Sequence, residues 1–374
     1  MHATLSAAMS PTRRAWLRGA GASVGLLGTG LATGLATLAA PRFVHALAPH
    51  ERVLDEAKSP FNHIVIAEDG DVITMYFVVD GTYYIESRYD RGHPRSLDLD
   101  YTRTMMAGFL LQPQPKRLLM IGFGGGQISN YLFEHVPDLE IDAVDIDPEV
   151  IRLARKHFGV PDDPRYRTHA ADGRLFVEKA PTSPPWDMIM LDAFRGVFVP
   201  LHLKTAEYYA ALLAHLGPQG VVVANLHNAT PMYKHDRTTF AHAFPQGYAF
   251  HTERGRQTIF VASAAERTVG AYEMRANAQV AQSAFDFDLL GLAARWYLTC
   301  DWDEEGVQVL HDDFSAKELE RGIERHNERC ARPIPRACCC SCTARSPPAT
   351  ARSPGSATTW SGSCGTPTTA GSSP

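Results

Sequence analysis

A run of glycines, with an acidic residue about twenty positions further on, is the most informative pattern in this chain. The glycines follow the apolar run 118–121, and Asp145 ends the next apolar run, 141–144. This order predicts a strand, a tight turn, a helix and a second strand with a carboxylate at its end. Glycines let the backbone approach a ligand closely, and such a carboxylate can accept both hydroxyls of a ribose, so we predict a site for an adenosyl nucleoside. The predicted nucleoside-binding glycines are Gly122, Gly124, Gly125 and Gly126.

Two further carboxylates follow predicted strands of the same sheet. Asp172, with Gly173 after it, comes next to the predicted strand 166–170, and Asp192 follows the apolar run 188–191. Because ligands of open α/β sheets bind at the carboxyl ends of the strands, we expect both side chains in one site. Asp172 could accept a hydrogen bond from an adenine amino group, or it could simply cap the next helix. Asp192 is the predicted catalytic base, facing a second substrate.

The elements that must position these residues alternate along the chain. Alternating apolar runs and helical segments predict a doubly wound α/β sheet with an antiparallel edge. Upstream, β-rich runs separated by Asp-Gly pairs predict a small antiparallel β domain. Helical structure is predicted over 97–111 and over 270–330. The predicted strands are 63–68, 72–79, 82–88, 118–122, 141–145, 166–170, 186–192, 220–226, 248–252 and 258–263.

Length and composition fit an ordinary α/β protein. The 374 residues are 45% hydrophobic and 21% charged, with a net charge of −5, and no basic stripe indicates a nucleic-acid partner. We divide the chain into five parts. They are a signal at 1–48, a β-hairpin domain at 49–95, a nucleoside-binding domain at 96–265, a helical segment at 266–332 and a disordered or out-of-frame tail at 333–374.

The N-terminal part resembles an export signal. Residues 12–18, TRRAWLR, fit the twin-arginine pattern, a stretch with six glycines follows at 19–40, and Ala46-Leu47-Ala48 offers a cleavage site. We expect export to the periplasm by the twin-arginine machinery. The alternative is an uncleaved signal that anchors the protein in the inner membrane, because the stretch is long enough to span a bilayer. Cleavage would remove four arginines and no acidic residue, changing the net charge from −5 to −9.

Cysteine and histidine spacing predicts no metal site. Residues 49–330 contain only Cys300 and Cys330, and four further cysteines lie within 338–342 of the tail. Three adjacent cysteines cannot easily aim at one ion, and no histidine accompanies them.

Taken together, the motifs resemble the spermidine synthase (polyamine aminopropyltransferase) family, within the wider class of AdoMet-dependent methyltransferase folds. The resemblance covers roughly residues 60–265 and includes the segments 121–126, 144–147, 171–173 and 191–193. It implies a class I methyltransferase-like Rossmann domain, a homodimer, and S-adenosylmethionine or its decarboxylated form as co-substrate. It also implies a small-molecule amine acceptor such as a polyamine, with Tyr101 shaping the acceptor pocket.

Three departures from the family pattern bear on the substrates. Family enzymes that make spermidine carry an Asp in the glycine loop that holds the donor amine, where this chain has Gly125. They carry a second Asp three residues after the catalytic one, where this chain has Arg195, and a Tyr-His-Glu run where this chain has 101–103, YTR. The loss of the loop Asp removes a clash with the carboxylate of ordinary AdoMet, and Arg195 would repel a polyamine if its side chain points inward. Together these changes predict drift toward AdoMet or another adenosyl ligand, unless acids such as Asp98 and Asp100 substitute.

The sequence therefore predicts a transferase that moves an alkyl group from an adenosyl sulfonium donor to an amine-type acceptor, with Asp192 as the base and Arg195 near the acceptor. Two alternatives stay open. The lost carboxylates favour an AdoMet-dependent methyltransferase with a non-polyamine acceptor. The export signal favours an exported, non-catalytic ligand-binding protein.

Overall fold

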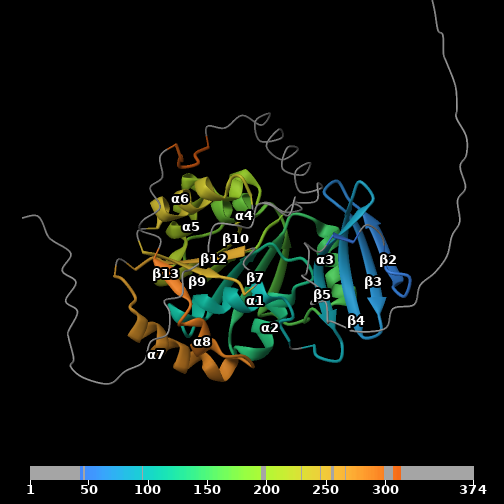
Figure 1. The fold of residues 1–374 in the computed structure, drawn as a ribbon, viewed down its shortest axis with the longest axis horizontal. Helices are drawn as coiled ribbons and strands as arrows, with labels where there is room; N and C mark the ends of the chain where they lie inside the picture. Colours follow the sequence, from blue (N-terminus) through green and yellow to red (C-terminus); the bar gives the residue numbers. More distant parts are fainter. Residues whose placement is uncertain are drawn as a thin grey trace, which may run out of the picture.

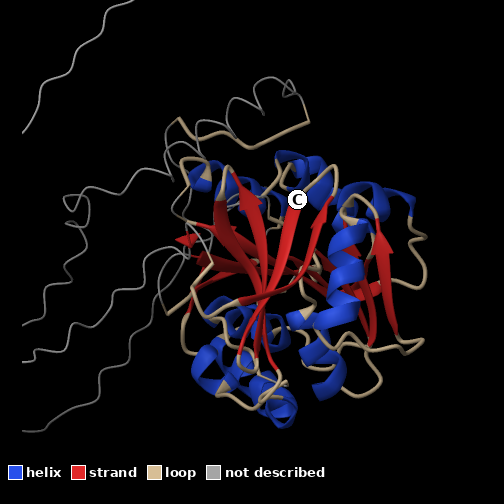
Figure 2. Ribbon diagram, turned by 90° about the vertical axis from the view of Figure 1, so that its right-hand side faces the viewer, coloured by secondary structure: helices blue, strands red, loops and turns tan. Residues whose placement is uncertain are grey.

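The computed structural model describes residues 43–44 and 47–312, with gaps at 95, 195–198, 229, 245, 254–256, 266 and 299–305. Nearly all of the predicted signal and all of the predicted tail therefore lie outside the described residues. The described part contains two sheets, and helices pack on both faces of the larger one (Figures 1 and 2). Within it, no helix combines the length and the apolar character needed to cross a membrane.

The larger sheet has eight strands. In chain order they are β6 (Arg117–Ile121), β7 (Glu140–Asp145), β8 (Tyr166–Ala170), β9 (Trp186–Leu191), β10 (Leu216–His227), β11 (Gly247–His251), β12 (Gln257–Ser263) and β13 (Trp296–Leu298). Their spatial order is β13-β11-β12-β10-β9-β6-β7-β8. The pairs from β10 to β8 are parallel, and those from β10 to β13 are antiparallel. This confirms the predicted doubly wound sheet with an antiparallel edge.

Helices cover both faces, so the central strands are apolar on both sides. One layer contains α1 (Asp100–Met105), η1 (Met106–Leu110), α2 (Gln127–His135), α3 (Pro148–His157), α7 (Ala271–Ala281), η3 (Gln282–Ala284) and α8 (Leu289–Leu292). The other contains α4 (Gly173–Lys179), η2 (Leu201–Leu203), α5 (Ala206–Ala214) and α6 (Tyr233–Ala243). Figure 2 shows the strands between these two layers.

The N-terminal sheet lies beside this domain (Figure 1). Its strands are β1 (Phe43–Val44), β2 (Arg52–Lys58), β3 (His63–Asp69), β4 (Val72–Val79) and β5 (Thr82–Asp90), in the antiparallel order β1-β5-β4-β3-β2. The predicted hairpin turns are present, and Gly70 and Gly81 adopt positive φ angles of 58° and 78° there. Sequence reasoning missed β2, because this edge strand has four charged residues among seven and no alternation of apolar side chains.

Two helical predictions need correction. The helix predicted over 97–111 begins at Asp100 and tightens into the 3₁₀ helix η1, where Gly108 packs closely against Val223 of β10. The segment predicted to be helical from 270 to 330 contains α7 and α8, but also β13, which pairs with β11. Trp296 of β13 packs edge-on against Tyr248, and this tertiary contact outweighs local helix preference.

One buried carboxylate joins the two sheets. Asp147 caps α3 and accepts a hydrogen bond from the Glu149 backbone N–H at 3.0 Å. Its other oxygen accepts hydrogen bonds from Ser59 Oγ at 2.6 Å and from Asn62 Nδ2 at 2.9 Å, both in the loop between β2 and β3. Asp147 is 0% exposed, so these contacts fix the N-terminal sheet against the larger domain.

We expect Asp147→Ala to lower the free energy of unfolding by about 2–4 kcal/mol, because it removes a helix cap and leaves buried donors without an acceptor. Urea unfolding followed by circular dichroism measures the change. Asp162→Ala, at an exposed position, is the control and should shift stability by less than about 0.5 kcal/mol. Equal stability of Asp147→Ala and the wild type would contradict the assignment.

Candidate active site

The turn after β6 is fixed by the close approach of two strand ends. Gly122 has a φ of +91°, a conformation that favours glycine. A Cβ atom on Gly122 would lie 2.5 Å from the carbonyl oxygen of Asp192, which follows β9. Only glycine lets these ends meet, and the result is that Asp192 lies beside the loop.

The N-terminal sheet packs onto the remainder of the loop. The backbone N–H of Gly125 donates a hydrogen bond to Ser87 Oγ of β5 at 2.8 Å. A Cβ atom on Gly125 would lie 2.7 Å from both the Ser87 Cβ and a ring carbon of Phe158. Position 125 therefore has no room for a side chain, and the carboxylate that family enzymes carry in this loop could not be accommodated here.

Asp145 ends β7, as predicted, and holds the loop in place. One of its oxygens accepts hydrogen bonds from the backbone N–H groups of Phe123 at 3.1 Å and Gly124 at 3.3 Å, and the other accepts from that of Asp147 at 3.0 Å. Burial raises the pKa of Asp145, and these three backbone donors oppose that rise. Its position at the mouth of the glycine turn is compatible with ribose binding, which stays a prediction.

Asp172 performs the capping role that was one of its two predicted functions. One oxygen accepts a hydrogen bond from the Leu175 backbone N–H at 3.0 Å, at the start of α4, and the other lies 2.8 Å from His202 Nε2. Burial is the largest influence and would raise the pKa of Asp172, but the bond to His202 and the backbone hydrogen bonds at Leu175 and Arg174 together outweigh it, so the pKa is lowered. The adjacent Gly173 is required because its Cβ would lie 2.4 Å from Ile121. The adenine-binding role of Asp172 stays a prediction.

Asp192 is held by two side chains from different elements. Its Oδ1 accepts a hydrogen bond from Asn225 Nδ2 of β10 at 2.8 Å, and the Tyr101 hydroxyl of α1 also bonds to this carboxylate. Burial raises the pKa of Asp192 to about 7, and both hydrogen bonds act against that rise. The structure therefore brings together Tyr101 and Asp192, which sequence reasoning placed in one pocket.

Glu86 was not predicted as a site residue. Strand β5 contains a bulge, since Ile85 pairs with Tyr76 and Ser87 pairs with Met75, leaving Glu86 without a cross-strand partner. A bulge redirects the side chain of its extra residue, and here the Glu86 carboxylate reaches the glycine loop, 3.3 Å from where a Cβ on Gly124 would lie. Burial, together with the nearby Asp192 and Asp145 carboxylates, raises the pKa of Glu86 to about 8.

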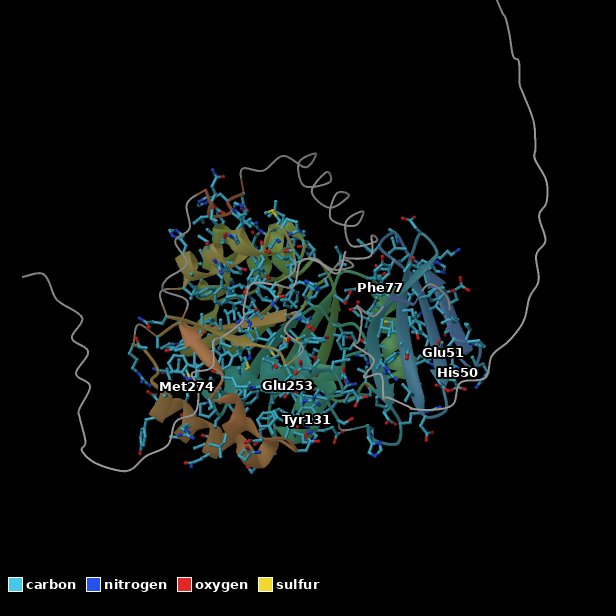
Figure 3. The ribbon with its side chains drawn as sticks, viewed as in Figure 1. His50, Glu51, Phe77, Tyr131, Glu253 and Met274 are labelled. Atoms are coloured by element: carbon cyan, nitrogen blue, oxygen red, sulfur yellow. The ribbon has the colours of Figure 1, made fainter. Side chains whose placement is uncertain are left out.

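Two hollows meet at these carboxylates. The larger, of about 270 Å³, extends from Glu86, Asp192 and Asp145 toward Asp172 and His202. Its other lining residues are mostly apolar and include Phe61, Ile146, Phe194 and Leu203. Phe77 of β4, labelled in Figure 3, also lines this hollow. The smaller, of about 20 Å³, has mainly polar walls; besides Glu86 and Asp192 these include Ser87, Tyr101, Thr102, Gln127 and Ser129.

The titratable groups that line the site are mainly acidic. Glu86, Asp145 and Asp192 are half-buried. Among the lining residues that the structure describes, the only basic one is His202, and it pairs with Asp172. The two hollows therefore suit a cationic ligand with an apolar, planar part.

A larger open hollow of about 620 Å³ lies elsewhere, bounded by α4 and the strands β7 and β8. Two of its three basic lining residues, Arg117 and Arg167, contact Asp142, and the hollow lacks the glycine turn together with Glu86, Asp145 and Asp192. We therefore place the site at the glycine loop. Across the described residues, no cluster of three or more His, Cys, Asp or Glu side chains is arranged to bind a metal ion.

Several predicted residues fall outside this arrangement. Gly125 and Gly126 line neither hollow. Neighbouring side chains pack closely against both positions, and this packing explains why both residues are glycines. Asp98 and Asp100 line neither hollow, and their suggested role as substitute acids stays a prediction. Arg195 lies outside the described residues.

Sequence reasoning missed Glu86, Asn225 and His202. Asn225 carried a signal in the sequence, because it is the single polar residue in the apolar run 221–226. The structure shows that it is 1% exposed. Glu86 carried none, since charged residues are common in exposed strand positions and the bulge that redirects it depends on pairing with β4.

The sheet order, the glycine turn and the strand-end carboxylates define a class I methyltransferase-like transferase fold. The spermine/spermidine synthase domain matches residues 100–276. The polyamine aminopropyltransferase of Vibrio vulnificus (strain CMCP6) is 30% identical over 272 residues, which cover 71% of this chain and 91% of that protein. The polyamine aminopropyltransferase of Chromobacterium violaceum is 32% identical over 187 residues, covering 50% of this chain and 70% of that protein.

A solved structure agrees in fold. The crystal structure of a probable spermidine synthase from Corynebacterium glutamicum superposes with a TM-score of 0.54 and 20% identity, over 70% of this chain and 97% of that one. With the sequence relatives, this confirms the predicted resemblance: the chain belongs to the spermidine synthase (polyamine aminopropyltransferase) family and is a transferase.

The raised pKa values predict a pH-dependent stability. Glu86 and Asp192 are harder to ionise in the folded protein than in the unfolded chain, so the stability that these two groups contribute is fully present below about pH 4 and is lost as the pH rises toward 8. We expect Glu86→Gln to be more stable than the wild type at pH 8, by on the order of 2 kcal/mol, and similar to it at pH 5.

Urea unfolding of ligand-free protein at pH 5, 6.5 and 8 tests this. Glu253→Gln, at an exposed position after β11, is the matched control and should follow the wild type at each pH, because its partner Arg295 does not titrate in this range. A stability difference between Glu86→Gln and the wild type that does not change with pH would contradict the electrostatic account.

Proposed function

We propose that this protein transfers the aminopropyl group of decarboxylated S-adenosylmethionine to an amine acceptor such as a polyamine. Two findings support the proposal. The chain belongs to a family whose curated relatives include polyamine aminopropyltransferases. Three carboxylates also converge on its cavity, where both expected substrates would present positive charge.

In this proposal the larger hollow holds the nucleoside. The Asp145 carboxylate would accept the ribose hydroxyls while keeping its bonds to the loop backbone. Asp172 and His202 lie at the adenine end, and the side chains of Ile146 and Leu203 provide apolar contact area for a planar base. The sulfonium would then lie near Gly122, where the two hollows meet.

The reaction is a displacement at the carbon beside the sulfonium. The lone pair of the acceptor amine forms the new C–N bond, the C–S bond breaks, and its electron pair stays on sulfur, giving the neutral thioether methylthioadenosine. The amine must lose a proton, and Asp192 is the carboxylate placed to accept it. Its pKa of about 7 suits a base that works near neutral pH.

Asn225 and Tyr101 position this base. Both bond to the Asp192 carboxylate, one from β10 and one from α1, so the direction of its remaining lone pairs is fixed before substrates bind. This carboxylate, held by two side chains beside the Gly122 turn, is the observation that carries the proposal.

We expect purified protein to convert decarboxylated S-adenosylmethionine and a di- or polyamine into methylthioadenosine and an aminopropylated amine, measured by liquid chromatography and mass spectrometry. Asp192→Asn should lower kcat by at least about 100-fold, because it removes the base. Asp162→Asn is the matched control and should leave kcat unchanged. Methyl transfer from S-adenosylmethionine, with no turnover of the decarboxylated donor, would instead establish the methyltransferase alternative.

We also propose that the protein is exported by the twin-arginine route to the periplasm, on the basis of the residues 12–18, TRRAWLR. Because this route requires the arginine pair, the full-length protein carrying Arg13→Lys and Arg14→Lys should stay in the cytoplasm. Cell fractionation with immunodetection measures this. An equal periplasmic share for both proteins would contradict the proposed route, and a wild type found in the membrane fraction would favour the uncleaved anchor.

A further inference from the structure

Glu86 is a carboxylate for which the structure offers no partner. Among the described residues, none donates a hydrogen bond to it and none forms an ion pair with it, while Asp145 and Asp192 both add negative charge nearby. It lines both hollows, at the point where they meet. An ionised carboxylate in such a place requires a cation, and the substrate is the cation that would enter.

We propose that Glu86 binds the ammonium group on the aminopropyl arm of the donor and thereby selects the decarboxylated sulfonium over S-adenosylmethionine. This inference rests on the proposed function and assigns a specificity-determining residue to it.

The position of Glu86 favours the donor arm over the acceptor. Its carboxylate lies close to Gly124, whose backbone N–H donates a hydrogen bond to Asp145. Glu86 and Asp145, the residue predicted to bind the ribose, therefore lie at the same turn. Asp192 lines the same two hollows, but Tyr101 and Asn225 hold its carboxylate. The two amines of the reaction thus have separate carboxylates, one for a spectator cation and one for the amine that must lose its proton.

The small hollow fits a compact polar group. Its volume of about 20 Å³ is room for one water-sized group. An ammonium head is of that size and donates three hydrogen bonds, and Glu86 is accompanied there by oxygen acceptors on Ser87 and Gln127. The larger carboxylate of S-adenosylmethionine would need more space and would add a negative charge beside Glu86 and Asp192.

The glycine loop cannot supply this carboxylate itself. Ser87 and Phe158 fill the space that a side chain at Gly125 would take. Ser87 is the neighbour of Glu86 on β5. The packing of Ser87 that leaves no room for a side chain at position 125 therefore also places the Glu86 carboxylate at the glycine loop.

Isothermal titration calorimetry with the intact protein tests the inference, using three adenosyl ligands. Decarboxylated S-adenosylmethionine and S-adenosylmethionine share the sulfonium and differ only in the arm, whereas methylthioadenosine lacks both the charged arm and the sulfonium charge. We expect the wild type to bind the decarboxylated donor at least about tenfold more tightly than S-adenosylmethionine. In Glu86→Gln, affinity for the decarboxylated donor should fall by about 10- to 100-fold, while affinity for methylthioadenosine changes by less than about threefold.

Controls separate this role from the others. Glu253→Gln should bind all three ligands like the wild type. Asp192→Asn should lose turnover but keep the donor preference. An unchanged donor preference in Glu86→Gln, or equal losses for all three ligands, would overturn the inference while wild-type turnover still supported the proposed function. A wild type that neither binds nor turns over the decarboxylated donor would overturn both.

Discussion

The constraint on which this site depends is the gathering of Glu86, Asp145 and Asp192 around one glycine turn. Taking carboxylates out of water is unfavourable, and no described cation offsets that cost, so the ligand-free pocket holds protons that ordinary carboxyl groups would release. A cationic sulfonium and a cationic amine provide the missing charge. The site is thus less stable without its substrates than with them, as expected where binding and catalysis determine the residues.

The two sheets form this pocket jointly. The larger sheet supplies Asp145 and Asp192 at neighbouring strand ends, since parallel strands place their carboxyl ends at one edge. The N-terminal sheet supplies Glu86 from a bulge, and it is fixed by Asp147, which accepts hydrogen bonds from the loop between β2 and β3. Domain packing and donor binding therefore depend on the same contacts. The most direct of these is the hydrogen bond from the backbone N–H of Gly125 in the loop to Ser87, the residue that follows Glu86.

Sequence alone was sufficient for the elements whose signals are local. The strands of the larger sheet, its antiparallel edge and the placement of Tyr101, Asp145 and Asp192 follow from periodicity, turn chemistry and family motifs. Features that depend on pairing were not predictable. The bulge at Glu86 arises from the register of β5 against β4, and the strand β13 arises from an edge supplied by β11.

The glycine loop illustrates how a motif can mislead when it is considered without its surroundings. Gly125, in place of the family carboxylate, suggested a pocket that had drifted away from decarboxylated donors. The structure shows that the space is taken by Ser87 and Phe158, while Glu86 brings a carboxylate to the same turn from the adjacent strand. A charge needed by the chemistry can be carried by any element that reaches the site. The donor preference of such a protein then depends on the bulge and on the packing of the two sheets, so the loop residues alone cannot assign it.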